Sequence, residues 1–218
     1  MSNGKNPKMK ILRFQLGQLQ ANTYFLINED KCLIIDPADE APFILEELQR
    51  RKLKLIGMLS THGHFDHVMA AGEIQLSFKV PLYINKKDQF LLDRLQETAE
   101  YFLGFKPTIL SIKKIVPSTA GSRLGGKNFE YQIILTPGHT PGSVSYYFPK
   151  DKIVFTGDTL FKGAIGRYDF SYCNKEDLKK SLALLLKLPG ETKVLTGHGE
   201  ETSIKEEKEN LSKFLKIL

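Results

Sequence analysis

The chain has 218 residues, of which 41% are hydrophobic, so it can bury a substantial core within one large domain. Its polar opening lacks an apolar signal segment and no run is long enough to span a bilayer, so we expect a cytoplasmic protein with no membrane partner. The net charge of +6 comes from lysines scattered along the chain, which argues against a nucleic-acid partner.

The first third of the chain is typical of a β-rich unit with one covering helix. Residues 1–8 are expected to be disordered. Short apolar runs separated by Asn, Asp, Gly and Pro then predict strands at 10–16, 23–27, 33–35 and 55–59. Apolar residues at helical spacing, with Pro42 near the first turn, predict a helix over 42–52.

The last of these strands runs directly into a histidine-rich motif, Thr-His-Gly-His-Phe-Asp-His, at residues 61–67. Helical spacing predicts a helix over 68–78 immediately after it, so the motif lies in a strand-to-helix loop. Loops of this kind often carry chemistry, because a rigid scaffold presents a backbone that can remain irregular.

The remainder of the chain also alternates helices, strands and short loops. Residues 88–105 predict a helix closed by Gly104, and a polar, glycine-rich stretch follows at 118–127. Further patterns predict strands at 132–135, 144–148, 153–156 and 193–195, and helices at 176–188 and 203–218. Because no linker separates these elements, we expect one domain over residues 1–218.

All five histidines lie in three short motifs, and two aspartates accompany them. The resulting potential metal ligands are His62, His64, Asp66, His67, His139, Asp158 and His198. Alternation along the first motif lets His62 and His64 point toward one ion while Asp66 and His67 turn toward a neighbouring one. Imidazole and carboxylate ligands suit zinc, iron or manganese, and the lack of cysteine ligands argues against a closed structural zinc site.

The three later residues share one sequence context. Taken singly, His139, Asp158 and His198 are each compatible with an ordinary turn residue. Each of them, however, follows a predicted strand and lies beside glycine, which permits a close approach of the backbone to an ion. The repetition of this context favours metal ligands.

Taken together, the motifs T-H-G-H-F-D-H, T-P-G-H-T-P-G-S, F-T-G-D-T-L-F and T-G-H-G resemble those of metallo-β-lactamase-fold hydrolases, of the compact bacterial type related to glyoxalase II. The resemblance runs from about Lys10 to the C-terminus. It implies an α/β fold, a four-layer αββα sandwich of two mixed β-sheets flanked by helices. Two positions depart from the family: Thr196 replaces a proline, and Ala38 replaces a glycine.

The resemblance also implies a centre of two divalent metal ions, for which zinc is expected and iron or manganese are the alternatives. By position, the first ion would take His62, His64 and His139, the second would take Asp66, His67 and His198, and Asp158 would bridge both. As catalytic residues we expect Asp66, which could orient the attacking water, and Asp158.

Three residues are expected to contact the substrate. Arg167 matches an arginine of the family and suits a clamp for a substrate carboxylate, or alternatively an ion pair with Asp169 that holds the loop. Tyr101 and Phe105 are expected to cover the metal cleft and shape an acyl pocket, whereas Phe102 is expected to pack in the core.

The leading hypothesis is hydrolysis of a thioester of the hydroxyacylglutathione type by a metal-bridged hydroxide. Full-length glyoxalase II grips glutathione with a separate helical domain, and only twenty residues follow His198 here, so we expect that domain to be missing. Of the properties that the resemblance implies, specificity for glutathione therefore has the weakest support in the sequence. The expected partner is a small-molecule thioester, and the expected assembly is a monomer or a homodimer.

The closest alternative is a persulfide dioxygenase acting on glutathione persulfide, which shares the fold but uses one iron. His62, His139 and Asp158 would then form a two-histidine, one-carboxylate triad with open positions. A β-lactamase is less favoured because no signal segment is visible, and an RNA-processing nuclease because no basic arm or added domain is present to hold RNA.

Overall fold

The computed structural model describes residues 9–118 and 129–214. The disorder expected for residues 1–8 lies outside the described residues. So do most of the predicted polar stretch at 118–127 and the end of the predicted closing helix.

The first sheet has six strands that lie in chain order. They are β1 (Lys10–Leu16), β2 (Ala21–Asn28), β3 (Lys31–Ile35), β4 (Lys54–Leu59), β5 (Leu82–Ile84) and β6 (Ile115–Pro117). The first three strands pair antiparallel, and β3 to β6 pair parallel through helical crossovers. The parallel part brings the carboxyl ends of β3 and β4 to one edge, where the histidine motif begins.

The second sheet has five strands in the order β13-β12-β9-β8-β7, and a small hairpin pairs β10 with β11. The strands are β7 (Gln132–Leu135), β8 (Val144–Phe148), β9 (Ile153–Gly157), β10 (Leu160–Phe161), β11 (Ala164–Ile165), β12 (Lys193–Thr196) and β13 (Thr202–Ser203). Only β9 and β12 pair parallel within the five-stranded sheet, so both sheets are mixed, as predicted.

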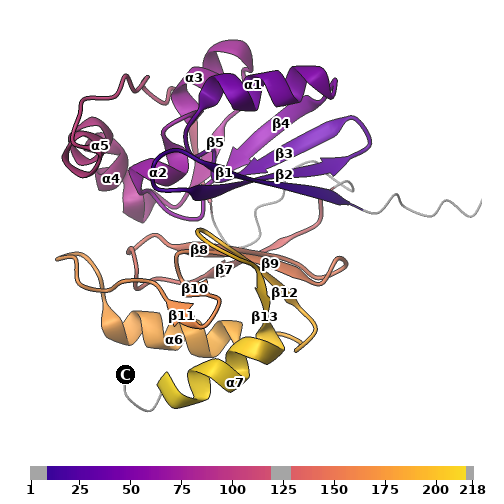
Figure 1. Cartoon of the computed structure of the whole chain (residues 1–218), viewed down its shortest axis with the longest axis vertical. Coiled ribbons are helices and arrows are strands. Elements are labelled where there is room, and N and C mark those ends of the chain that lie inside the picture. Colours follow the sequence, from indigo (N-terminus) through magenta and orange to yellow (C-terminus); the bar gives the residue numbers. More distant parts are fainter. Residues whose placement is uncertain (1–8, 119–128, 215–218) are drawn as a thin grey trace, which may run out of the picture.

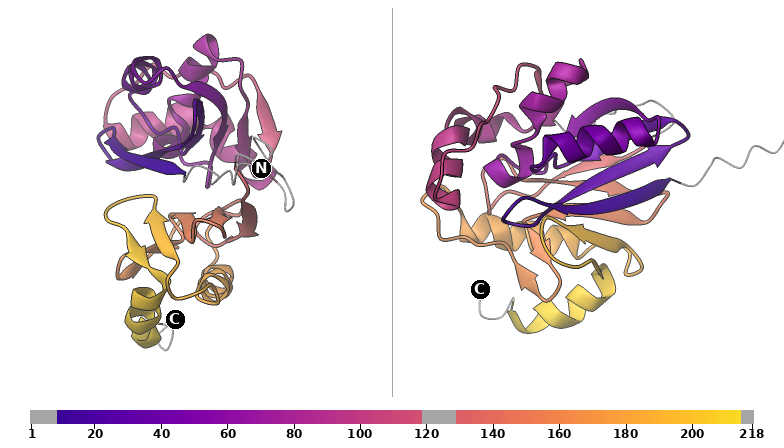
Figure 2. Two further views of the ribbon diagram at one scale, coloured as in Figure 1. Left: turned by 90° about the vertical axis from the view of Figure 1, so that its right-hand side faces the viewer. Right: turned by 45° about the horizontal axis from the view of Figure 1, so that its top comes forward.

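The helices form the outer layers of the molecule. They are α1 (Ala41–Arg50), α2 (Phe65–Val68), α3 (Ala71–Ser77), the 3₁₀ turn η1 (Lys86–Asp88), α4 (Gln89–Asp93), α5 (Leu95–Leu103), α6 (Lys175–Leu185) and α7 (Ile204–Phe214). Helices α1 and α3 cover the outer face of the first sheet, and α6 and α7 cover that of the second (Figure 1). Figure 2 shows the same four layers from two other sides, which confirms the predicted αββα sandwich.

Side-chain alternation explains why the two sheets stack. In β3, Cys32 and Ile34 pack in the apolar core beneath the helices of the first sheet, whereas Leu33 and Ile35 pack in the core between the sheets. A strand that is buried on both faces carries a continuous apolar run. The core between the sheets also contains large aromatic side chains, including that of Tyr146 from the second sheet.

Two predicted helices are interrupted, and the sequence pattern missed both breaks. The helix predicted over 68–78 corresponds to two helices, α2, which begins earlier at Phe65 and ends at Val68, and α3, which begins at Ala71. The break arises because the Ala70 N–H donates to the carbonyl of Ala38 instead of continuing the helix. The helix predicted over 88–105 is divided at Arg94 into α4 and α5. Within the described residues, no helix is long and apolar enough to cross a membrane.

Candidate metal centre

The seven predicted ligands lie together at one end of the sandwich. His62 and His64 occupy the loop after β4, and Asp66 and His67 lie in the short helix α2. The other three residues, His139, Asp158 and His198, follow β7, β9 and β12 of the second sheet. Because β9 and β12 are parallel neighbours, their carboxyl ends present Asp158 and His198 side by side.

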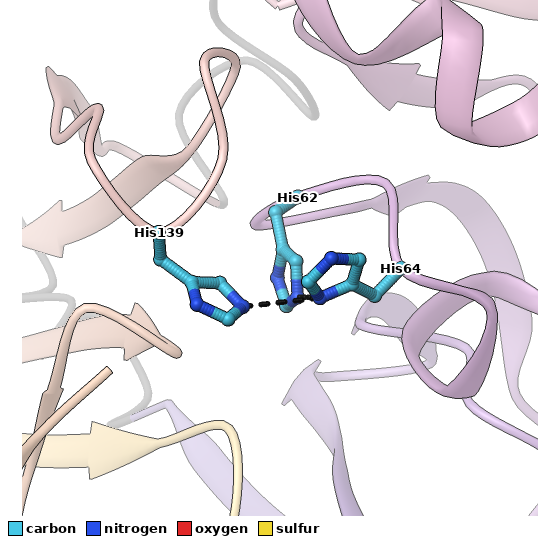
Figure 3. A group of neighbouring side chains, drawn as sticks. All are labelled: His62, His64 and His139. Carbon is cyan, nitrogen blue, oxygen red and sulfur yellow. Dashed lines mark hydrogen bonds between the residues drawn. The ribbon is translucent and has the colours of Figure 1, made fainter. Parts of the chain in front are cut away.

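One group of rings joins the two sheets. The Nδ1 atom of His64 lies 3.1 Å from Nε2 of His62 and 3.0 Å from Nε2 of His139. Figure 3 shows that the three rings point toward one another from opposite sides, His139 from the second sheet and the other two from the motif loop. All three ligand atoms lie within 4.8 Å of one another, close enough to share one ion.

A second group lies beside the first and also combines both sheets. The Nε2 atom of His198 is 3.2 Å from Oδ2 of Asp66 and 3.2 Å from Nε2 of His67. The distance from Nε2 of His67 to Oδ2 of Asp66 is 3.6 Å. Two rings and one carboxylate therefore converge on a second point.

The carboxylate of Asp158 lies between the two groups. Its Oδ1 is 3.4 Å from Nε2 of His67, and its Oδ2 is 3.6 Å from Nε2 of His139 and 3.7 Å from Nε2 of His198. Among the described residues, no hydrogen-bond donor contacts the buried Oδ1. A Cβ atom at Gly197 would lie 2.0 Å from this oxygen, so only glycine allows the carboxylate to occupy this position.

Hydrogen bonds at the far side of each ring determine which nitrogen faces inward. The Nδ1–H groups of His67, His139 and His198 donate to Oδ2 of Asp36 at 3.0 Å, the carbonyl of Arg167 at 2.9 Å and the carbonyl of Leu19 at 3.0 Å, respectively. Since carbonyl and carboxylate oxygens only accept, these three rings carry their proton at Nδ1 and turn a bare Nε2 inward.

The two rings of the motif loop are oriented in a comparable way. The Thr61 hydroxyl donates to Oδ2 of Asp36 at 2.7 Å and thus accepts from Nδ1 of His62 at 3.0 Å, which leaves Nε2 of His62 bare. Nε2 of His64 lies 2.8 Å from the Tyr172 hydroxyl, so Nδ1 is the inward atom of this ring. Nitrogen lone pairs about 3 Å apart repel one another unless a cation lies between them.

Electrostatics also favours a positive charge at this point. Burial would lower the pKa of His67, but the carboxylates of Asp158, Asp66 and Asp36 outweigh burial and raise it to about 10. Without a metal ion, a proton would therefore occupy Nε2 of His67, in the place that an ion takes when it binds. In contrast, burial and the neighbouring His139 ring lower the pKa of His64 to about 3. The group of Asp66, His67 and His198 therefore attracts a cation, and the rings of the first group are uncharged. A divalent metal fits both groups.

Two buried carboxylates outside the ligand set hold the ligand loops, and sequence reasoning did not assign either role. Besides the contacts above, Asp36 accepts the Thr61 N–H at 2.7 Å. Asp88 accepts the N–H of Gly63 at 2.9 Å, the Thr140 hydroxyl at 2.7 Å and the N–H of Gly142 at 2.6 Å. Asp88 thereby ties the motif loop to the loop of His139.

The only sequence signal for these carboxylates was positional. Asp36 directly follows a predicted strand, and Asp88 begins a predicted helix, where an aspartate usually caps the helix. Burial raises the pKa of Asp88, and its hydrogen bonds from Thr140, Gly63 and Gly142 oppose that rise.

Both residues that depart from the family pattern, Thr196 and Ala38, form hydrogen bonds within the ligand loops or next to them. The hydroxyl of Thr196 donates its one proton to the carbonyl of His198 at 2.6 Å, and the carbonyl of Glu200, at 3.2 Å, shares that proton as a second acceptor. Thr196 thus braces the loop from within. The N–H of Ala38 donates to the Thr23 hydroxyl at 3.2 Å.

A cavity of about 300 Å³ opens onto the two groups. Its lining comprises Leu19, His64, Phe65, Asp66, Thr98, Phe102, His139, Asp158, Arg167, Phe170, Tyr172 and His198. Arg167 reaches the cavity, and its guanidinium also forms a two-pronged ion pair with Asp169, with both contacts at 2.7 Å. The alternative interpretation of Arg167, a loop-holding ion pair, is thus present in the structure.

The other two predicted substrate contacts lie elsewhere. Tyr101 is 81% exposed and borders a neighbouring hollow, and Phe105 is 50% exposed and borders another one beside α1. Phe102, which we expected in the core, instead lines the metal cavity. Helical geometry explains why Tyr101 and Phe102 face different hollows, because successive residues of α5 point about 100° apart. Phe105 lies beyond the end of α5.

Known proteins resemble the chain over most of its length. Among curated relatives, it is 37% identical to the probable metallo-hydrolase YqgX of Bacillus subtilis, with 90% of this chain and 93% of that protein covered. It is 36% identical to the hydroxyacylglutathione hydrolase GloC of Haemophilus influenzae, with 92% and 95% covered.

Solved structures show the same fold. The di-iron-bound form of TTHA1623 has a TM-score of 0.84 at 35% identity, covering 91% of this chain and 98% of that one. The B3 metallo-β-lactamase BLEG-1 has a TM-score of 0.83 at 32% identity, covering 92% and 97%. ETHE1 from Myxococcus xanthus has a TM-score of 0.73 at 27% identity, covering 93% and 83%. The model of the metallo-beta-lactamase superfamily matches residues 16–198, and the chain belongs to this superfamily.

Proposed function

We propose that this metal-dependent hydrolase holds two divalent ions and cleaves a thioester of the hydroxyacylglutathione type. The observation that carries the proposal is the position of Asp158, whose carboxylate lies beside His139 of the first ligand group and beside His67 and His198 of the second. A single ion would leave the group of Asp66, His67 and His198 without a function. The choice of a thioester is supported by the 36% identity to a protein named for hydroxyacylglutathione hydrolysis.

The residues fit two ions. One ion would be held by His62, His64 and His139. The other would be held by Asp66, His67 and His198, and Asp158 would contact both ions. The ring nitrogens that face inward, and Oδ1 of Asp158, which has no hydrogen-bond partner among the described residues, are the atoms that would bind these ions. Divalent ions bound there would make a nucleophile available at neutral pH by lowering the pKa of water, to about 7 in the case of zinc.

The residues of the chain then orient the reactants. Asp66 lines the cavity and can accept a hydrogen bond from the attacking water, which aligns a lone pair of the water with the substrate carbonyl. A thiolate is a good leaving group, so the site requires no strong general acid. We propose a small-molecule thioester as the partner, because the ligand groups open into a cavity of about 300 Å³, at the lower end of the range for small-molecule sites.

The rival function is a mononuclear-iron persulfide dioxygenase, supported by the similarity to ETHE1 at 27% identity. In that case His62, His139 and Asp158 would hold one iron. A β-lactamase activity is also open to a direct test, because the similar structure of BLEG-1 is named for that activity.

The deciding experiment combines metal analysis with turnover. Purified protein is analysed for zinc, iron and manganese and then assayed with lactoylglutathione, with glutathione persulfide in an oxygen electrode, and with a chromogenic cephalosporin. We expect two ions per chain and hydrolysis of lactoylglutathione. One iron per chain together with oxygen consumption on the persulfide would establish the dioxygenase instead.

A matched pair of variants controls this assay. Asp66→Asn removes a proposed ligand, whereas Asp30→Asn alters a carboxylate that pairs with Lys54 at the surface, 2.7 Å away. We expect the first variant to lose both one ion and activity, and the second to retain both.

A further inference from the structure

One side of the metal cavity is a continuous surface of aromatic rings, here called the aromatic wall and composed of Phe65, Phe102, Phe170 and Tyr172. Phe65 stacks on Phe102 at 5.9 Å, and Phe170 stacks on Tyr172 at 5.3 Å. Phe102 meets Phe170 edge to face at 6.3 Å, so the wall continues from one pair to the other.

The wall begins at the metal ligands themselves. The centroid of the His64 ring lies 5.8 Å from that of Phe170 and 6.0 Å from that of Tyr172. A group attached to a carbonyl at the metal centre would therefore reach the wall without crossing open solvent. Position alone makes the wall a candidate contact for the substrate.

Core packing accounts for only part of the wall. Phe65 is buried, but Phe102 is 42% exposed, and Phe170 and Tyr172 are half-buried although all four line the cavity. Large apolar side chains that remain open to a concave site gain free energy when a ligand covers them. The exposed apolar surface of the wall is flat, because it consists of the faces and edges of aromatic rings.

On the side of the wall that faces the metal cavity, the described residues offer no unpaired lysine or arginine to a charged substituent. Arg167 is the sole lysine or arginine among the described residues that line the cavity. Its guanidinium lies 4.0 Å from the centre of the Phe170 ring and is neutralised by Asp169. It thus extends the flat surface rather than offering an unpaired cation.

We propose that the acyl group of the substrate carries a flat, uncharged ring that packs against the aromatic wall. A phenyl group can meet the rings of Phe170 and Phe102 at their edges, because Tyr172 and the Arg167 guanidinium already lie against the faces of Phe170. The methyl group of a lactoyl substrate leaves both rings uncovered. This inference rests on the proposed thioester hydrolysis and narrows its substrate class to aryl-substituted acyl thioesters.

The test compares two substrates that share their thiol and their hydroxyl. Mandeloylglutathione and lactoylglutathione differ only in a phenyl group in place of a methyl group, and each rate is divided by that of uncatalysed alkaline hydrolysis. We expect the metal-loaded protein to prefer the mandeloyl substrate by at least about 10-fold in kcat/KM, because a hydrophobic pocket discriminates even single methylene groups by this factor.

Two variants, one near the end of α5 and one just beyond it, make the test specific. Phe102→Ala should bring the preference close to one, mainly by raising KM for the mandeloyl substrate. Phe105→Ala removes a ring of similar exposure, 50%, that borders a different hollow, and should leave the preference unchanged. Phe102→Leu, which keeps apolar volume but not the flat ring, should give an intermediate preference, and circular dichroism checks that each variant folds.

The outcomes separate this inference from the proposed function. Equal use of both thioesters, or a preference that Phe102→Ala does not change, overturns the aromatic wall as a specificity determinant and leaves thioester hydrolysis standing. Hydrolysis of neither thioester overturns the proposed function.

In the latter case the wall is tested without turnover, by saturation-transfer NMR of metal-free protein with mandelamide and lactamide. Ring saturation of mandelamide that disappears in Phe102→Ala supports the wall. Equal signals from the native protein and the variant overturn it.

Discussion

The candidate metal centre is built from two parts that the molecule supports in different ways. The first-sheet part is the short segment from His62 to His67, and its rings are held by buried side chains, above all the carboxylate of Asp36. The second-sheet part consists of His139, Asp158 and His198, which come from three separate loops.

In the second-sheet part, the histidine rings themselves are held by backbone groups. His139 donates to a backbone carbonyl at 2.9 Å and His198 to another at 3.0 Å, and Gly197 leaves room for the carboxylate of Asp158. A single substitution can remove a supporting side chain but not a carbonyl group. Substitution of a neighbouring side chain should therefore disturb the ligand positions of the first-sheet part. The ligand positions of the second-sheet part should instead be disturbed by changes that move the backbone of its loops.

The largest expected effect comes from the residue that faces both ligand groups. Asp158→Ala should lower kcat/KM by roughly 10³-fold, because a metal centre supplies several kcal/mol of transition-state stabilisation and this carboxylate joins its two halves. Steady-state kinetics with parallel metal analysis measures the effect. A variant that retains two ions and full activity would contradict the bridging position.

Removal of the metal should destabilise both parts together. Saturating ions at about 1,000 times their Kd stabilise a protein by about 4 kcal/mol, so a strong chelator should lower Tm by about 10 °C. Differential scanning calorimetry with and without chelator measures the shift, and added zinc should reverse it. An unchanged Tm in chelator would argue against tightly bound ions.

Asp88 tests the connection between the two parts. Asp88→Asn replaces an acceptor by an amide whose N–H₂ must face one of the donors of Gly63, Thr140 or Gly142, and should cost about 3 kcal/mol of unfolding free energy. Urea unfolding measures this cost. Asp93→Asn, on the exposed face of the same region, is the control and should change stability by less than about 0.5 kcal/mol.

The smallest expected effect concerns the loop of His198. Thr196→Val keeps the shape of the side chain but removes the hydrogen bond to the His198 carbonyl, and should cost about 1.5 kcal/mol, or about 3–6 °C in Tm. Thr192→Val is the matched control, because the buried Thr192 hydroxyl has no partner among the described residues and its loss should be neutral or stabilising. Equal Tm losses in both variants would show that the Thr196 hydrogen bond is unimportant.

Much of the architecture could be predicted because its signals are local. Apolar runs and helical spacing identified most strands and helices, and all four metal-ligand motifs followed predicted strands, as the structure has them. The break after Val68 could not be predicted, since it arises from a hydrogen bond between Ala70 and the distant Ala38. Asp88 was missed for the same reason: its three donors lie 25 to 54 residues away in the sequence.

The sequence by itself determined which side chains are available as ligands and that each follows a strand, because strand periodicity and motif spacing are properties of neighbouring residues. Only the tertiary structure decided which ring nitrogens face inward, since the carbonyls of Arg167 and Leu19 reach His139 and His198 only after folding. It also placed Phe102, and not Tyr101 or Phe105, against the metal cavity. That placement depends on how α5 packs beside α2, a contact between elements that no local pattern encodes.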